Sequence, residues 1–315
     1  MLGLLFGLTF LGFCDSFESA AEWIFIRRGR IAVGLTNKIG VIVDSFGLGI
    51  RDGLIKAKEI GADGVQIWVT QGEMEPANMT QEKRAELKRF VQELGLDISA
   101  LCADFGGNGF KDPAQNGWKI EKSKRALDLA LDLDCRVVTT HIGIVPEDPK
   151  DPVYAVLQEA CNELAAYAHS LGGYFAIETG PETAERLKGF LDSLDSKGVA
   201  VNFDPANMVM VTGDDPAKGV HTLKEYIVHT HVKDGVRLKE VNPYDVYGAL
   251  DHTKLDQEPG FKEVPVGEGG VDFDAYFKAL QDIGYTGYLT VEREVGDQPE
   301  ADIKLAVDFI KRYRS

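Results

Sequence analysis

Residues 174–204 read YFAIETGPETAERLKGFLDSLDSKGVAVNFD, and their pattern recurs along most of the chain. The segment opens with a short apolar run at 174–179, continues through an amphipathic stretch at 183–196, and closes with a second apolar run at 199–204. Nearly continuous apolar runs of this length are typical of parallel strands that are covered on both faces. The segment therefore predicts a strand–helix–strand unit.

The same alternation begins at residue 31. The predicted strands are residues 31–36, 65–70, 97–104, 136–142, 174–179, 199–204, 227–232 and 286–292. The predicted helices are residues 50–60, 80–94, 120–133, 152–171, 183–196, 216–226, 273–283 and 300–313. Eight strands alternating with eight helices predict a (β/α)8 barrel, also called a TIM barrel. A doubly wound sheet is the main alternative, but no Gly-x-Gly-x-x-Gly pattern follows the first predicted strand.

The barrel is expected to be a single catalytic domain at residues 31–315, preceded by an N-terminal extension at residues 1–30. Residues 1–13 are apolar but too few to cross a bilayer, and no basic segment precedes them. We therefore expect no stable membrane insertion. The longest irregular stretch, 235–270, follows the seventh predicted strand and is interpreted as a lid or an oligomer contact.

Acidic residues dominate the charge of the chain. The 50 Asp and Glu residues exceed the 34 Lys and Arg residues, which gives a formal net charge of −16. This balance repels phosphate backbones and argues against nucleic acid as a partner. The four cysteines form no Cys-x-x-Cys pair, so they are interpreted as small buried hydrophobes in a reducing, cytoplasmic setting.

The last four predicted strands each end in an ionisable residue: Glu178, Asp204, His231 and Glu292. Strand C-termini converge on one face of a barrel, so these side chains are expected to meet. Burying them is costly unless their charge is compensated, and one divalent cation would compensate all four. Oxygen ligands with one imidazole suit Mn²⁺, the favoured ion here, or Mg²⁺ or Co²⁺. The alternative is four separate, solvated loop residues.

A cation held there would leave coordination positions open for the oxygens of a substrate. A carbonyl bound at such a site is polarised, and the adjacent C–H becomes acidic. Two carboxylates on opposite sides could remove and return that proton, and Glu178 and Glu292 are the natural pair. The pattern therefore predicts proton transfer next to a carbonyl.

Five motifs carry a resemblance to a known family: AIETG at 176–180, NFDPAN at 202–207, HTHVKD at 229–234, PVGEGGVDF at 265–273 and GYTGYLTVE at 284–292. Through them, residues 31–314 resemble the xylose-isomerase-like TIM-barrel superfamily of sugar isomerases and epimerases, which also includes the apurinic endonuclease IV group. The resemblance implies a metal ion held by the four strand-end residues, with the two glutamates as the acid/base pair. In the ketose epimerases of this superfamily, an arginine six residues after the metal histidine holds a substrate hydroxyl, and Arg237 matches it.

Two positions depart from the ketose-epimerase pattern. Asn207 stands where these epimerases tend to have a histidine, and Ala184 stands where they have a substrate-binding glutamate. Asn207 is retained here as a candidate substrate contact.

Other candidate substrate contacts also lie near strand ends. His141 would bind a substrate hydroxyl or cap a loop, and Trp68 would stack on a sugar face or pack at the rim. Lys233 would hold a substrate oxygen, unless the alternation of the strand points it away. His229 is interpreted as support for the metal site or as a satisfied core histidine.

Three functions remain open at this point. The leading hypothesis is a divalent-metal-dependent isomerase or epimerase that acts on a ketose or keto-sugar through an enediolate. The second keeps the metal and the proton abstraction but ends in elimination, as in a dehydratase of a keto-inositol or a lyase of a 3-keto-glycoside. The third is a non-catalytic sugar-binding or partner subunit. The family resemblance also suggests a homo-oligomer.

Overall fold

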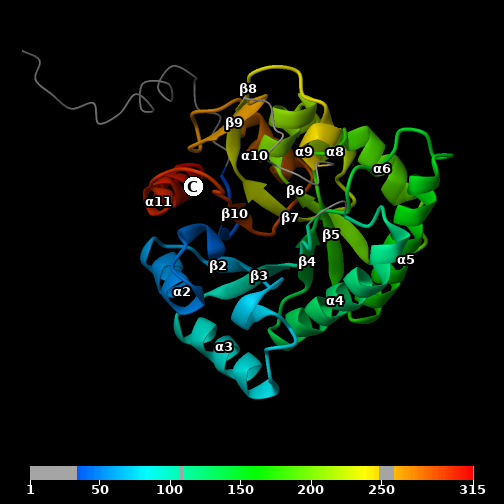
Figure 1. The fold of residues 1–315 in the computed structure, drawn as a ribbon. Coiled ribbons are helices and arrows are strands. Elements are labelled where there is room, and N and C mark those ends of the chain that lie inside the picture. The colour runs from blue at the N-terminus through cyan, green and yellow to red at the C-terminus, as the bar shows by residue number, and fades with distance from the viewer. Residues whose placement is uncertain (1–33, 107–108, 248–258, 315) are drawn as a thin grey trace, which may run out of the picture. The chain divides into compact units, whose positions relative to one another are not determined.

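A computed structural model describes residues 34–106, 109–247 and 259–314 of the chain. Eight parallel strands close into a barrel, in the order β1, β2, β3, β4, β5, β6, β7 and β10 around the ring (Figure 1). The barrel strands are β1 (Ile39–Ile42), β2 (Gly64–Trp68), β3 (Asp97–Cys102), β4 (Val137–Thr140), β5 (Tyr174–Glu178), β6 (Val199–Phe203), β7 (Ile227–Val232) and β10 (Leu289–Val291). The predicted (β/α)8 barrel is confirmed.

Helices alternate with the barrel strands along the chain, and side-chain caps mark where several of them begin. The main helices are α2 (Ile50–Glu59), α3 (Gln81–Glu93), α4 (Pro113–Asp132), α5 (Pro152–Ser170), α6 (Ala184–Asp192), α8 (Pro216–Thr222), α10 (Phe273–Asp282) and α11 (Pro299–Lys311). The Thr183 hydroxyl, for example, accepts a hydrogen bond from the backbone N–H of Arg186 at the start of α6. Such caps satisfy N–H groups that have no partner within the helix.

The side chains inside the barrel change in character along the strands. At one level, small apolar residues pack together: Ala100, Val137, Ala176 and Ala200. Thr139 and Asn202, which are buried and polar, follow two residues after Val137 and Ala200, and β2 and β7 contribute the buried polar side chains of Gln66 and His229. Because successive strand residues point to opposite faces, steps of two residues keep pointing into the barrel. Asp204 and His231 lie two residues beyond Asn202 and His229, and Glu178 lies two residues beyond Ala176, so all three are expected to point into the barrel.

The first strand differs from its prediction. It lies at Ile39–Ile42 rather than at residues 31–36, of which 31–33 fall outside the described residues. Leu35 instead makes an isolated bridge with Arg314. Gly40 explains the true position, because a Cβ atom there would lie 2.5 Å from the Thr290 hydroxyl oxygen across the seam with β10. The strand that closes the barrel therefore needs a glycine at this position. A glycine interrupts an apolar run, so a prediction from apolar runs does not favour this strand.

The stretch at 235–270 is not irregular throughout. It contributes an antiparallel pair, β8 (Asp234–Arg237) and β9 (Phe261–Val264), and a short helix, α9 (Pro243–Tyr247). Helix α4 also begins earlier than predicted, at Pro113 rather than at 120, because Asp112 caps it and proline is favoured in the first turn.

Two further predictions concern residues 1–30 and membrane insertion. The proposed N-terminal extension lies outside the described residues. None of the helices in the described ranges combines the length and apolar character that a bilayer crossing requires.

Candidate metal and substrate site

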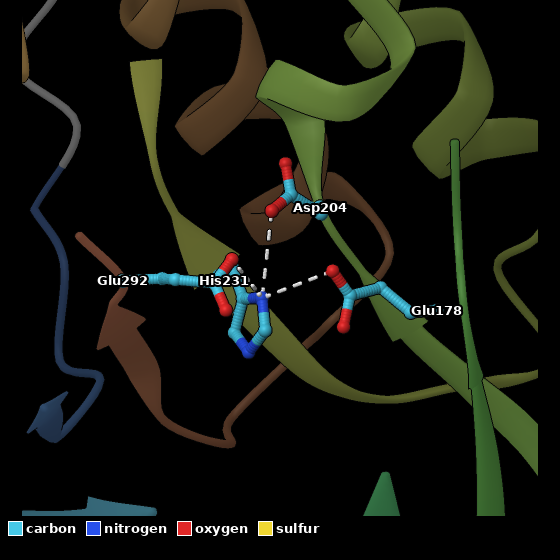
Figure 2. Close-up of side chains that lie close together, drawn as sticks. All are labelled: Glu178, Asp204, His231 and Glu292. Carbon is cyan, nitrogen blue, oxygen red and sulfur yellow. Dashed lines mark ion pairs between the residues drawn. The ribbon is translucent and has the colours of Figure 1, made fainter. Parts of the chain in front are cut away.

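The four strand-end residues converge as predicted. Glu178 ends β5, Asp204 follows β6, His231 lies in β7 and Glu292 follows β10, and one ligand atom of each lies within 4.8 Å of all the others. All four residues are buried. Figure 2 shows Glu178 and Glu292 on opposite sides of the His231 ring, with the Asp204 carboxylate facing the same nitrogen. The alternative of four separate solvated residues is therefore wrong.

The imidazole of His231 lies at the centre of the group. Its Nδ1 atom lies 3.2 Å from Glu292 Oε2, 3.4 Å from Asp204 Oδ2 and 3.7 Å from Glu178 Oε1. On the other side of the ring, Nε2 donates a hydrogen bond to Gln66 Oε1 at 3.1 Å. Burial would lower the pKa of His231, but Glu292 and Glu178 outweigh it and raise that pKa well above its ordinary value. A divalent cation bound here would take the place of the Nδ1 proton, and the imidazole would then present the Nδ1 lone pair to the ion.

Two buried atoms of this group find no hydrogen-bond partner among the described residues: His231 Nδ1 and Asp204 Oδ2. The other Asp204 oxygen accepts from the backbone N–H of Asn207 at 2.9 Å, which fixes the carboxylate at the start of the short helix α7 (Pro205–Asn207). Burial raises the pKa of Asp204, although Lys233 opposes the shift. A cation between these atoms would satisfy both, so the donor set fits a divalent metal ion.

Glu292 is paired with an ammonium group. Lys233 Nζ, which is buried, donates to Glu292 Oε2 at 2.9 Å and also to the Glu294 carboxylate. Burial by itself would raise the pKa of Glu292, but His231 and Lys233 outweigh it and hold that pKa well below its ordinary range. The ionised carboxylate is therefore the favoured resting form of Glu292.

Glu178 is held by two amides instead. Asn202 donates to its Oε2 at 3.1 Å and Asn207 donates to its Oε1 at 3.0 Å. The two glutamates thus face the same centre with different hydrogen-bond partners.

His141 adds a second imidazole beside this group. Its Nδ1 lies 2.8 Å from Asp104 Oδ2, and its Nε2 lies 3.8 Å from Glu178 Oε1. Burial would lower the pKa of His141, but Glu178 and Asp104 outweigh it and raise the pKa to about 10. The ring of Tyr247, from α9, lies over His141 with 5.5 Å between ring centres.

A cavity of about 880 Å³ opens above the four residues, and Glu178 and Glu292 line it. Four predicted substrate contacts line it too: Trp68, His141, Asn207 and Lys233. Arg237 does not belong to the described lining. It is exposed, and its guanidinium donates to the carbonyl oxygens of Thr212 and Lys239. The structure therefore does not support the predicted role of Arg237.

Several residues of the site were not recognised in the sequence: Gln66, Asn202, Tyr247 and Glu294. Asn202 and Gln66 each lie two positions before a recognised strand-end residue, Asp204 and Trp68, and on the same strand face. That spacing was a usable indication. Tyr247 lies in a helix within the stretch that was interpreted as irregular, and nothing in its local sequence marks it.

Known proteins share this architecture. L-ribulose-5-phosphate 3-epimerase UlaE of Salmonella heidelberg is 24% identical over 271 residues, which cover 82% of this chain and 87% of the relative. A xylose isomerase domain protein from Planctomyces limnophilus superposes with a TM-score of 0.72 at 25% identity, over 89% of this chain and 98% of that structure. A D-tagatose 3-epimerase-like protein superposes with a TM-score of 0.67 at 20% identity, over 88% and 96%. The model of the xylose isomerase-like TIM barrel family matches residues 54–313, and the chain belongs to that family.

Proposed function

We propose that the protein is a divalent-metal-dependent epimerase or isomerase of a ketose or related keto-sugar. The observation that carries the proposal is the placement of Glu178 and Glu292 on opposite sides of one buried centre, both lining the cavity. The likeness to an L-ribulose-5-phosphate 3-epimerase supports the same class of reaction.

The metal ligands in this proposal are Glu178, Asp204, His231 and Glu292, with Mn²⁺ as the favoured ion and Mg²⁺ or Co²⁺ as alternatives. When bound, such an ion would polarise a substrate carbonyl and acidify the adjacent C–H. Gln66 holds the imidazole of His231 from behind by accepting from its Nε2. Partners of this kind orient metal-binding histidines in other proteins.

The proton steps fall to the two glutamates. One glutamate, as the carboxylate, removes the proton from the carbon next to the carbonyl, which leaves an enediolate, and the other, which begins protonated as the carboxylic acid, gives its proton to the opposite face. The two epimers use the pair in opposite senses, so each glutamate acts as base in one direction and as acid in the other. Lys233 holds Glu292 in place, and Asn202 and Asn207 hold Glu178.

The substrate contacts follow from the lining of the cavity. His141 and Asn207 present polar groups beside Glu178, and Trp68 offers an aromatic face at the end of β2. Aromatic rings with nearby polar groups suit a sugar, which has both apolar C–H faces and hydroxyls.

The test is a screen of ketoses and keto-inositols with the Mn²⁺-loaded protein in D₂O. Deuterium is expected to enter at the carbon next to the carbonyl, and chelation of the metal is expected to stop it. A product that is one water lighter would show elimination instead. Sugar binding without any deuterium incorporation would contradict the proposal and favour a non-catalytic subunit.

A further inference from the structure

The ionisable side chains among the described residues that line the cavity are mainly acidic. The described lining residues include five carboxylates, Asp104, Glu178, Glu263, Glu292 and Glu294, but only two lysines, Lys233 and Lys262, and no arginine. Lys233 already donates to Glu292 and Glu294, and His141 is paired with Asp104. The basic groups near the metal centre are therefore occupied by the chain's own carboxylates.

In the loop after the seventh barrel strand, potential phosphate-binding N–H groups are likewise bonded to a carboxylate of the chain. Backbone N–H groups in the loops after strands seven and eight commonly bind phosphate in TIM barrels. Here four such groups are directed at the Asp234 carboxylate. Asp234 Oδ2 accepts from Gly267 at 2.9 Å and Gly269 at 2.8 Å, and Oδ1 accepts from Gly235 at 2.9 Å and Val271 at 3.2 Å.

The fit around Asp234 is tight. A Cβ atom at Gly269 would lie 2.1 Å from Asp234 Oδ1, so the glycine is needed for the turn to wrap the carboxylate. Asp234 itself is buried, with an exposed fraction of 1%. The Asp234 carboxylate thus occupies the position that a bound phosphate would need.

The loop after the eighth barrel strand also offers no unpaired cation to a phosphate among its described residues. Its arginine, Arg293, donates to Glu263 Oε1 at 2.5 Å and to Asp302 Oδ2 at 2.9 Å. The next residue, Glu294, lines the cavity, and its side chain is 56% exposed. A phosphate brought to this rim would meet a carboxylate, and like charges placed together oppose binding.

From these contacts we infer that the substrate is an uncharged keto-sugar and carries no phosphate group. The inference rests on the proposed function, and it distinguishes this chain from its relative that is named for L-ribulose 5-phosphate. Neutral groups in the lining, such as the side-chain oxygen of Asn207 and the Tyr247 hydroxyl, suit sugar hydroxyls.

Lys262 is the strongest counter-argument in the described lining. It lies on β9 at the exposed rim of the cavity and could attract an anion. A single lysine offers only a point charge, however, whereas phosphate sites usually combine several N–H donors. The experiment below therefore includes a variant of this residue.

The test compares matched pairs, such as ribulose with ribulose 5-phosphate and fructose with fructose 6-phosphate, on the full-length Mn²⁺-loaded protein. Calorimetry gives the affinity for each member, and deuterium uptake in D₂O gives kcat/KM. The neutral member is expected to be favoured at least about tenfold in both quantities, because phosphate meets like charge at the rim. Glu294→Gln should narrow that ratio, and Lys262→Ala should leave the ratio unchanged.

The outcomes separate the two proposals. Tighter binding of the neutral members without deuterium uptake would refute the proposed reaction and uphold the charge selection. A phosphate ester that is bound or turned over as well as its neutral partner would overturn the inference, most clearly if Lys262→Ala removed that preference. Failure of every pair to bind would overturn both.

Discussion

His229 and His231 lie two residues apart on β7, and both are buried inside the barrel with 5.7 Å between ring centres. His229 donates from Nδ1 to Asn202 Oδ1 at 2.8 Å and accepts at Nε2 from the Thr290 hydroxyl at 2.9 Å. Burial, reinforced by His231, lowers its pKa well below the ordinary value. His231 instead turns Nδ1 toward three carboxylates.

The comparison shows that burial and residue type do not decide the role of a histidine in this barrel. The partners decide it. At His229, both ring nitrogens are bonded to neutral groups, the Asn202 amide and the Thr290 hydroxyl. A buried network whose polar groups are all paired in this way stabilises the core. At His231, three carboxylates surround the ring, and His231 Nδ1 and Asp204 Oδ2 find no hydrogen-bond partner among the described residues. Such buried groups suit a bound cation.

The largest effect should follow from changing a carboxylate at the level of His231. Glu292→Gln keeps the shape but removes a proton acceptor, so kcat should fall by about 10²- to 10⁴-fold. The melting temperature should change far less than the activity. The matched control is Glu300→Gln on exposed α11, and wild-type turnover by Glu292→Gln would refute the assignment of the acid/base pair.

A substitution at the level of His229 should affect stability instead. His229→Leu leaves Asn202 Oδ1 and the Thr290 hydroxyl without their partner, at a cost of about 1–3 kcal/mol for each unsatisfied group. Urea unfolding would measure the loss. The variant should still bind its metal ion, and a loss of metal without a loss of stability would break the distinction between the two levels.

Glu182 sharpens the comparison, because it is a buried acid to which no cationic side chain of the described residues donates a hydrogen bond. It accepts from the backbone N–H of Val145 at 3.1 Å, and burial raises its pKa to about 7 from 4.5. The folded state therefore binds this proton more tightly, so stability should fall as the pH rises from about 4.5 to about 7. The fall should amount to at most about 3 kcal/mol.

Glu182→Gln keeps an oxygen that can accept from Val145 and removes the titration. Unfolding free energies at pH 5 and pH 8 should then differ less in the variant than in the wild type. An equal difference in both proteins would show that Glu182 does not titrate in this range.

The smallest of these effects should come from changing Gln66, which orients His231 by accepting a hydrogen bond from its ring. Gln66→Leu removes the acceptor for His231 Nε2, and loss of such a partner typically weakens metal affinity about 10- to 100-fold. Equilibrium dialysis with Mn²⁺ would measure it. Gln66→Glu, which keeps an acceptor, should lose less, and equal losses in both variants would argue against this role.

The sequence predicts the barrel and the four converging residues well, because both depend on local patterns. Apolar runs mark the strands, and in a parallel barrel the end of each strand is also a position on the rim. The first strand was misplaced because its position depends on the contact of Gly40 with Thr290, residues that lie 250 positions apart. Contacts of this range leave no local pattern.

The supporting residues were harder to predict for the same reason. Gln66 reaches His231 from β2, three strands away around the barrel, and Tyr247 reaches His141 from a helix beyond β8. Arg237 illustrates the converse, since a matching position in the sequence did not place its side chain in the cavity. Spacing along the chain predicts which residues share a strand end, but not which partners fill the space between strands.

The most direct test of the account is the Mn²⁺ content of the purified protein after equilibrium dialysis, measured for the wild type, His231→Leu and His229→Leu. We predict one ion per chain in the wild type and in His229→Leu, and a loss of binding in His231→Leu. Absence of stoichiometric Mn²⁺, Mg²⁺ or Co²⁺ from the wild type, or undiminished binding by His231→Leu, would contradict the claim that these four residues form a metal site.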